Sequence, residues 1–114
     1  MKCRTLLCIA ALAALAACGK SAAPAAVQPA APLTAELQKL YDGSCKTCHS
    51  LPASGAPQVG DAKAWAPRLA QGKEVLLGHV INGYQKMPPM GLCMQCSEEE
   101  FIALTEHMSG GRLQ

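Results

Sequence analysis

The 114-residue chain has few aromatic side chains: one Trp, one Phe and two Tyr. So few large rings leave little apolar volume for a core, and small domains usually need a disulfide, a metal or another cofactor for stability. No apolar run is long enough to span a bilayer as a helix. No stretch shows the sustained alternation of apolar and polar residues that is typical of strands. The sequence therefore predicts an all-α domain whose core is completed by a bound group.

The chain also lacks a marked excess of positive or negative charge. The full chain carries ten Lys and Arg against eight Asp and Glu. Two of the basic residues, Lys2 and Arg4, precede an apolar run over 6–17 that is typical of an export signal. Without residues 1–17 the positive and negative charges balance. With no basic surplus and no basic run, nothing in the sequence indicates nucleic-acid binding.

Small residues surround the cysteine that follows the apolar run. The stretch Leu15-Ala16-Ala17-Cys18-Gly19 resembles the lipobox of bacterial lipoproteins. The resemblance implies a signal peptide over 1–17 and lipid attached to Cys18; the alternative is ordinary cleavage nearby that leaves Cys18 as a free thiol. Residues 18–32, rich in Ala and Pro, are expected to tether a folded domain over 33–114. The chain is then expected on the periplasmic side of the cell envelope, anchored to the outer rather than the inner membrane.

The most informative motif is Cys45-Lys46-Thr47-Cys48-His49, because Cys-x-x-Cys-His is the attachment signature of c-type haem. Helix positions i, i+3 and i+4 share one face, so Cys45, Cys48 and His49 can meet one porphyrin. The two thiols can add to the haem vinyl groups while the imidazole binds the iron. The motif predicts one covalent haem c, held by Cys45 and Cys48, with His49 as its first axial ligand.

A second Cys-x-x-Cys pair lies near the end of the chain. Cys93 and Cys96 are followed by Ser97, where a haem site needs histidine, so no second haem is predicted. The two cysteine pairs could instead hold zinc together, and a structural zinc module is the main alternative function. A thioredoxin-like oxidoreductase is a weaker alternative, because the βαβ pattern that accompanies its motif is missing.

Local signals predict about four short helices in the segment 33–114. The predicted N-caps are Thr34, Asp61 and Ser97. Pro67 is expected to interrupt the helix that follows Asp61, and Gly83 is expected to end a helix over 74–82. Glu100 completes a capping box with Ser97 ahead of the last helix.

The surroundings of the iron are predicted in part. Pro57 can offer a backbone carbonyl to the ring nitrogen of His49 that does not bind the iron, without a competing N–H of its own. The candidate sixth ligands are Met87, Met90, Met94, Met108, His79 and His107. Met87 is preferred because Pro88-Pro89 restrict its loop and because His/Met ligation is common in c-type haems. Met90, three residues further along the same loop, is the runner-up.

Several short stretches together carry a family resemblance. They are Cys45-Lys46-Thr47-Cys48-His49, Gly55-Ala56-Pro57, Val59-Gly60-Asp61, Trp65-Ala66-Pro67-Arg68, Asn82-Gly83, Met87-Pro88-Pro89 and Cys93-Met94-Gln95-Cys96-Ser97. On these stretches the segment 41–108 resembles the cytochrome c5 family, small bacterial electron-transfer cytochromes of class I. The chain departs from the family at Met90 and Leu92, where relatives often have Lys and Gly.

The resemblance implies a class I cytochrome c fold with Met87 as the axial methionine. It also implies a disulfide between Cys93 and Cys96, for which a redox-cycling pair is the alternative. Trp65 and Arg68 match positions beside the haem and its propionates. The implied function is one-electron transfer to or from a respiratory partner: an oxidase, a reductase or another cytochrome. Two filled axial positions would leave no site for a substrate, so no enzyme activity is predicted.

Overall fold

The computed structural model describes residues 32–114, which form five α-helices, two 3₁₀-helices and no strand. The elements are α1 (Ala35–Gly43), α2 (Lys46–His49), η1 (Pro52–Ser54), α3 (Ala62–Leu69), α4 (Lys73–Asn82), η2 (Pro89–Leu92) and α5 (Glu98–Ser109). The all-α class expected from the sequence is confirmed. The expected signal peptide, the Cys18 lipidation site and the tether up to residue 31 lie outside the described residues. Within 32–114, every helix is too short or too polar to span a membrane.

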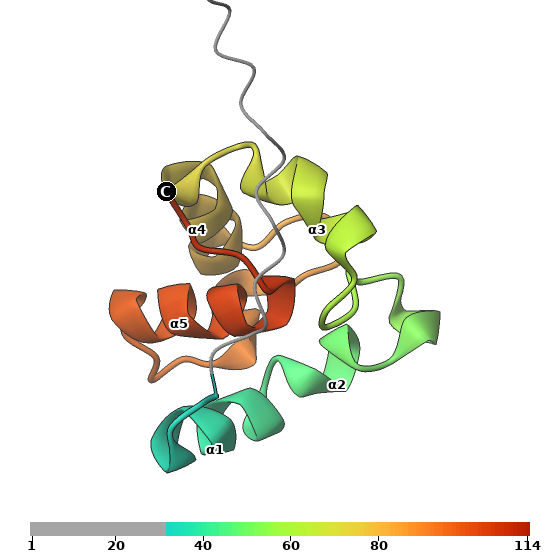
Figure 1. The fold of residues 1–114 in the computed structure, drawn as a ribbon. Helices are drawn as coiled ribbons and strands as arrows, with labels where there is room; N and C mark the ends of the chain where they lie inside the picture. The colour runs from blue at the N-terminus through green and yellow to red at the C-terminus, as the bar shows by residue number, and fades with distance from the viewer. Residues whose placement is uncertain (1–31) are drawn as a thin grey trace, which may run out of the picture.

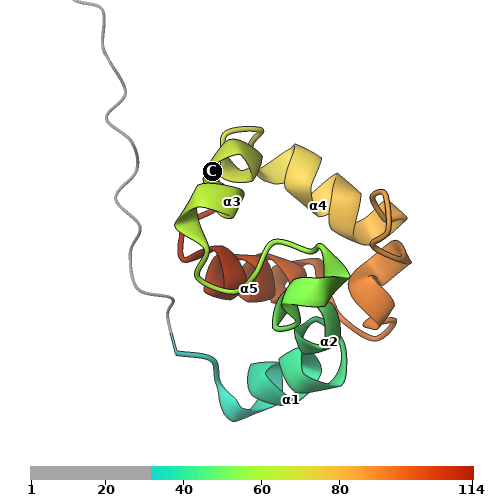
Figure 2. The same ribbon diagram turned by 90° about the vertical axis from the view of Figure 1, so that its right-hand side faces the viewer.

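Helix α5 runs through the middle of the domain, with α1 and α2 on one side and α3 and α4 on the other (Figure 1). It packs against α1, α3 and α4. The view in Figure 2 shows the same order, with the C-terminus close to α3 and the start of α4. There the N–H of Lys73 donates to the carbonyl of Gln114 at 2.8 Å. The last helix and the C-terminal residues therefore connect the two halves of the domain.

One face of α5 supplies the centre of the core. Phe101, Leu104 and Met108 follow one another at helical spacing, and all three are buried. They pack in one cluster with Tyr41 of α1 and Trp65 of α3. Three of the four aromatic side chains are thus in this core, and cysteine and methionine side chains fill much of the remainder.

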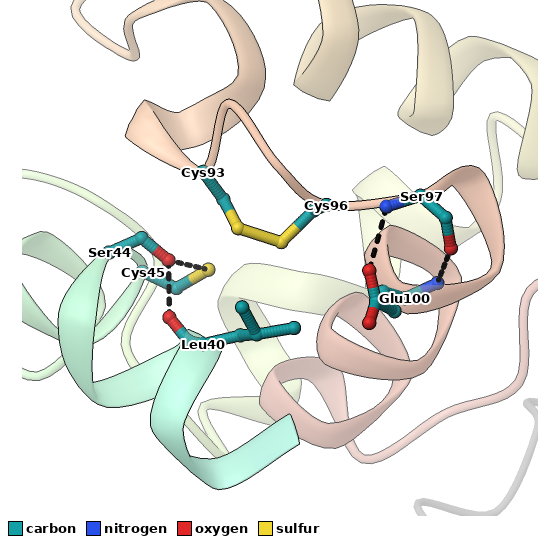
Figure 3. Close-up of a disulfide and its surroundings, with 7 residues drawn as sticks. All are labelled: Leu40, Ser44, Cys45, Cys93, Cys96, Ser97 and Glu100. Carbon is teal, nitrogen blue, oxygen red and sulfur yellow. Dashed lines mark hydrogen bonds between the residues drawn. A yellow bond between two sulfur atoms is a disulfide. The ribbon is translucent and has the colours of Figure 1, made fainter. Parts of the chain in front are cut away.

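The three predicted helix caps are confirmed. The side chains of Thr34 and Asp61 each accept an N–H from the first turn of their helix. At α5 the capping box is complete (Figure 3): Ser97 Oγ accepts the N–H of Glu100 at 3.3 Å, and the Glu100 carboxylate accepts the N–H of Ser97 at 2.7 Å. These bonds satisfy backbone donors that have no partner within a helix.

Pro67 does not interrupt α3, and the prediction that it would was wrong. The residue lies inside the helix Ala62–Leu69. Proline has no N–H, so the carbonyl of Lys63 loses its helical donor. Lys63 is exposed, and water can take the place of that donor. The bond at the end of the helix, from the N–H of Ala70 to the carbonyl of Ala66, is intact at 3.1 Å.

Candidate haem site

Helix α2 is a single turn that carries most of the Cys45–His49 motif. Ser44 departs from helical geometry, with φ −139° and ψ −81°. The motif therefore forms a helix separate from α1. For this reason the described residues form five α-helices, one more than the roughly four that the sequence predicts. The N–H groups of Cys48 and His49 both donate to the carbonyl of Cys45, at 3.3 and 3.0 Å. All three motif residues thus lie on one helical turn, as the spacing predicts.

His49 is buried and oriented by Pro57. Its Nδ1 lies 2.8 Å from the Pro57 carbonyl oxygen. Because a carbonyl can only accept, Nδ1 carries the proton and Nε2 keeps a free lone pair. Burial lowers the pKa of His49; the Pro57 hydrogen bond opposes this, while the nearby charge of Arg68 lowers the pKa further. The ring is thereby held in its neutral form, which is the form that binds a metal ion.

A cavity of about 570 Å³ lies against this imidazole. Five predicted site residues line it: His49, Pro57, Trp65, Arg68 and Met87. Its volume is in the usual range for cofactor pockets, roughly 300–1,000 Å³. His79 and Lys86 line it with Arg68, whereas none of the described lining residues is acidic. This combination of an imidazole, a thioether and basic side chains fits a haem, whose iron accepts both ligands and whose propionates are negative.

Trp65 forms one wall of the cavity. Its indole lies nearly parallel to the His49 ring, with centroids 5.8 Å apart and planes inclined by 25°. The indole N–H donates to the carbonyl of Gln58 at 2.8 Å. Trp65 therefore both restricts the imidazole and fixes the loop that follows η1.

Met87 reaches the cavity from the loop after α4. Tyr84 and Met87 exchange two backbone hydrogen bonds, at 3.0 and 2.9 Å, and close a tight turn. Gly83 precedes this turn with φ +84°, and a Cβ there would lie 2.9 Å from the Met87 carbonyl oxygen. The position thus admits only glycine. The turn on one side and Pro88-Pro89 on the other fix where the thioether can lie.

Three of the other candidate ligands do not line the cavity. Met90 has a left-handed backbone (φ +59°) and packs against the hydrophobic core. Met94 is 72% exposed. His107 packs edge-on against Tyr41.

Two further candidates line the same cavity as His49. Met108 is also part of the buried core on α5. His79, on α4, stacks on Tyr84 with ring centroids 3.9 Å apart. The structure thus brings His49 together with Met87, Met108 and His79, and separates it from Met90.

The second cysteine pair lies in the core rather than at the cavity. The structure joins Cys93 and Cys96 in a disulfide, with Cα atoms 5.4 Å apart and both side chains buried. In Figure 3 the disulfide faces Leu40 and Cys45 across the gap between η2 and the end of α1. It leads directly into the capping box of α5. The bridge therefore ties the segment that follows Met87 to the last helix.

The first cysteine pair forms no disulfide. Cys45 is buried, with its Sγ 3.5 Å from Ser44 Oγ, and Cys48 is exposed. Neither lines the cavity, although the adjacent His49 does. With Cys93 and Cys96 bonded to each other, the four thiolates of the zinc alternative are not available. Among residues 32–114 no three His, Cys, Asp or Glu side chains are close enough together to hold a metal ion.

Two side chains that form hydrogen bonds near the motif were not predicted from the sequence. Ser54 Oγ donates to the carbonyl of Cys48 at 2.7 Å and accepts the N–H of Ala56 at 3.1 Å. Gln58 contacts the same turn through its side-chain amide. The bond from Ser54 to Ala56 has the i to i+2 spacing that serines form in turns, which is a local signal. The contacts of Gln58 with Cys48 and Leu51 carry no local signal, because these acceptors lie ten and seven residues away.

Comparison with known proteins identifies the class. The family model described as "Cytochrome C oxidase, cbb3-type, subunit III" matches residues 32–108. The chain is also 40% identical over 68 residues to cytochrome c5 of Azotobacter vinelandii, a match that covers 58% of this chain and 82% of that protein. The chain belongs to the cytochrome c5 family. As a c-type cytochrome, it binds haem c covalently, and its class is that of electron-transfer proteins and not of enzymes.

This cytochrome is also similar to two further proteins. Cytochrome c-555 of Chlorobaculum tepidum is 56% identical over 45 residues, which are 40% of this chain and 42% of that protein's length. A solved structure described as "Crystal structure of electron transfer complex of nitrite reductase with cytochrome c" contains a chain that is 38% identical, with a TM-score of 0.58. That match covers 68% of this chain and 95% of the other. It agrees with the class I fold expected from the sequence.

Proposed function

We propose that this cytochrome is a monohaem one-electron carrier whose iron is bound axially by His49 and Met87. The observation that carries the proposal is that both side chains line one cavity. The imidazole offers a free Nε2 there, and the thioether is a soft ligand that suits low-spin iron. With both axial positions filled by the protein, no position is left for a substrate.

In this proposal Cys45 and Cys48 hold the haem through two thioether bonds, and Pro57, Trp65 and Arg68 form its pocket. The spacing of the cysteines on one helical turn and the orientation of His49 by Pro57 support these roles. Haem c supplies an iron that exchanges one electron reversibly. The chain's own residues orient the imidazole, fix the methionine loop and exclude water.

The proposed location is the periplasmic side of the cell envelope. A signal peptide over 1–17, lipid on Cys18 and a tether over 18–32 would hold the haem domain, 33–114, at a membrane, preferably the outer one. The support is the resemblance of Leu15-Ala16-Ala17-Cys18-Gly19 to a lipobox.

The proposed partner is a redox protein: an oxidase, a reductase or another cytochrome. The similar solved structure is an electron transfer complex of nitrite reductase with a cytochrome c, which supports a partner of this kind.

A redox titration combined with ligand binding tests this function. The potential dependence of the visible spectrum is expected to show one reversible transition with the slope of a one-electron couple. The reduced native protein is expected not to bind carbon monoxide, because both axial positions are filled. The same protein in denaturant, where the methionine loop is released, is the positive control and should bind it. Binding to the native protein would favour a ligand-binding or peroxidase-like function instead.

A further inference from the structure

Three consecutive residues after η1 form hydrogen bonds with the two residues whose rings stack in the cavity. The carbonyl of Pro57 accepts Nδ1–H of His49 at 2.8 Å. The carbonyl of Gln58 accepts the indole N–H of Trp65 at 2.8 Å, and the N–H of Val59 donates to the His49 carbonyl at 2.9 Å. How the Pro57 carbonyl is aimed at the imidazole therefore depends on the peptide units on either side of it.

The side chain of Gln58 folds back over the end of α2. Its Nε2 lies 2.8 Å from the carbonyl oxygen of Ala56, 3.3 Å from that of Leu51 and 3.4 Å from that of Cys48. An amide nitrogen carries two hydrogens, so one serves Ala56 while Leu51 and Cys48 share the other. Ser54 also donates to both of these carbonyls, through its hydroxyl to Cys48 at 2.7 Å and through its N–H to Leu51 at 2.9 Å. A single half-buried amide thus connects the haem-attachment turn to the peptide unit that precedes Pro57.

We propose that Gln58 is a positioning residue that sets the haem reduction potential by holding the Pro57 carbonyl against the His49 imidazole. This inference rests on the proposed axial role of His49. The side-chain amide fixes the peptide unit before the one that carries the Pro57 carbonyl, and the bond from Trp65 to the Gln58 carbonyl fixes the peptide unit after it. A firm hydrogen bond at Nδ1 makes the imidazole a stronger electron donor. Stronger donation stabilises ferric over ferrous iron and lowers the potential.

The direction of the change in reduction potential distinguishes a positioning role of Gln58 from a general loosening of the haem pocket. Without the amide, the Pro57 carbonyl is less firmly held and its hydrogen bond to the imidazole weakens, so the potential should rise. A pocket that merely loosens would admit water, which stabilises the ferric charge and lowers the potential. The two roles of Gln58 thus predict shifts of opposite direction.

The test compares two variants and a control in the haem-loaded protein. Gln58→Met keeps the length of the side chain without a donor, and Gln58→Asn keeps the amide but shortens its reach. Both are expected to raise the midpoint potential by up to about 59 mV, which corresponds to a tenfold change for one electron. Exchange of the His49 Nδ1 proton, followed by NMR in the reduced state, should also become faster. Gln38→Met, at an exposed glutamine of α1, should change neither.

An unchanged or lowered potential in both Gln58 variants, whatever the rate of proton exchange, would overturn the inference while leaving the proposed carrier function intact. The parent protein reports on that function separately. A parent spectrum without histidine-ligated haem would overturn both proposals, before any variant is measured.

Discussion

Replacing Met87 by leucine is expected to convert a six-coordinate, low-spin haem into a five-coordinate, high-spin one. Leucine fills nearly the same volume, and such exchanges usually cost less than about 1.5 kcal/mol of folding free energy. The domain should therefore remain folded while the iron loses its sulfur ligand. Methionine ligation favours the reduced state, so the midpoint potential should fall. The visible spectrum and carbon monoxide binding to the reduced protein measure the change directly.

Met90→Leu and Met108→Leu are the matched controls for this substitution. Met90 packs against the hydrophobic core outside the cavity, and Met108 is part of the core although it reaches the cavity wall. Both variants are expected to keep a low-spin spectrum and to exclude carbon monoxide. If Met90→Leu became high-spin and Met87→Leu did not, the ligand assignment would pass to Met90.

The second large effect is expected from the double variant Cys45→Ala/Cys48→Ala. Neither thioether bond can form, so haem should no longer stay with the chain on a denaturing gel stained for haem. The cavity of about 570 Å³ then lacks its covalently held group. A domain this small depends on such a group for its core. Circular dichroism should therefore show a large loss of helix at room temperature.

The double variant Cys93→Ala/Cys96→Ala is the control, since it removes the other pair with the same spacing. It should keep covalent haem and be destabilised by about 2 kcal/mol, which is the order expected from closing a short loop. Thermal unfolding followed in the haem absorption band measures this difference. Covalent haem that survives in the first double variant, or disappears in the second, would refute the division of roles between the two cysteine pairs.

The parts that could be predicted from the sequence depend on residues close together in the chain. The haem motif needs only positions i, i+3 and i+4 of one turn, and the caps at Thr34, Asp61 and Ser97 each act within three residues. The prediction that Pro67 would interrupt its helix was wrong for a related reason. Its local preference against helix interiors is real, but the affected carbonyl lies on an exposed part of a short helix, where water can replace the lost donor.

The arrangement around the iron could be predicted from the residues only in part. The residues alone favoured Met87 because of Pro88-Pro89 but kept Met90 as a rival, because nothing in their spacing shows which one faces His49. The structure separates them through tertiary packing: the tight turn at Tyr84 directs Met87 to the cavity, while Met90 joins the core. The contacts of Gln58 likewise span up to ten residues and two loops. Side chains with such partners cannot be recognised from composition or periodicity.

The most direct test of the whole account is the metal content and visible spectrum of the mature chain, produced in cells that contain haem-attachment machinery. The account predicts one iron per chain, no zinc, and a thioether-linked low-spin haem that changes reversibly between two oxidation states. A colourless protein, or one that carries zinc in place of iron, would contradict it.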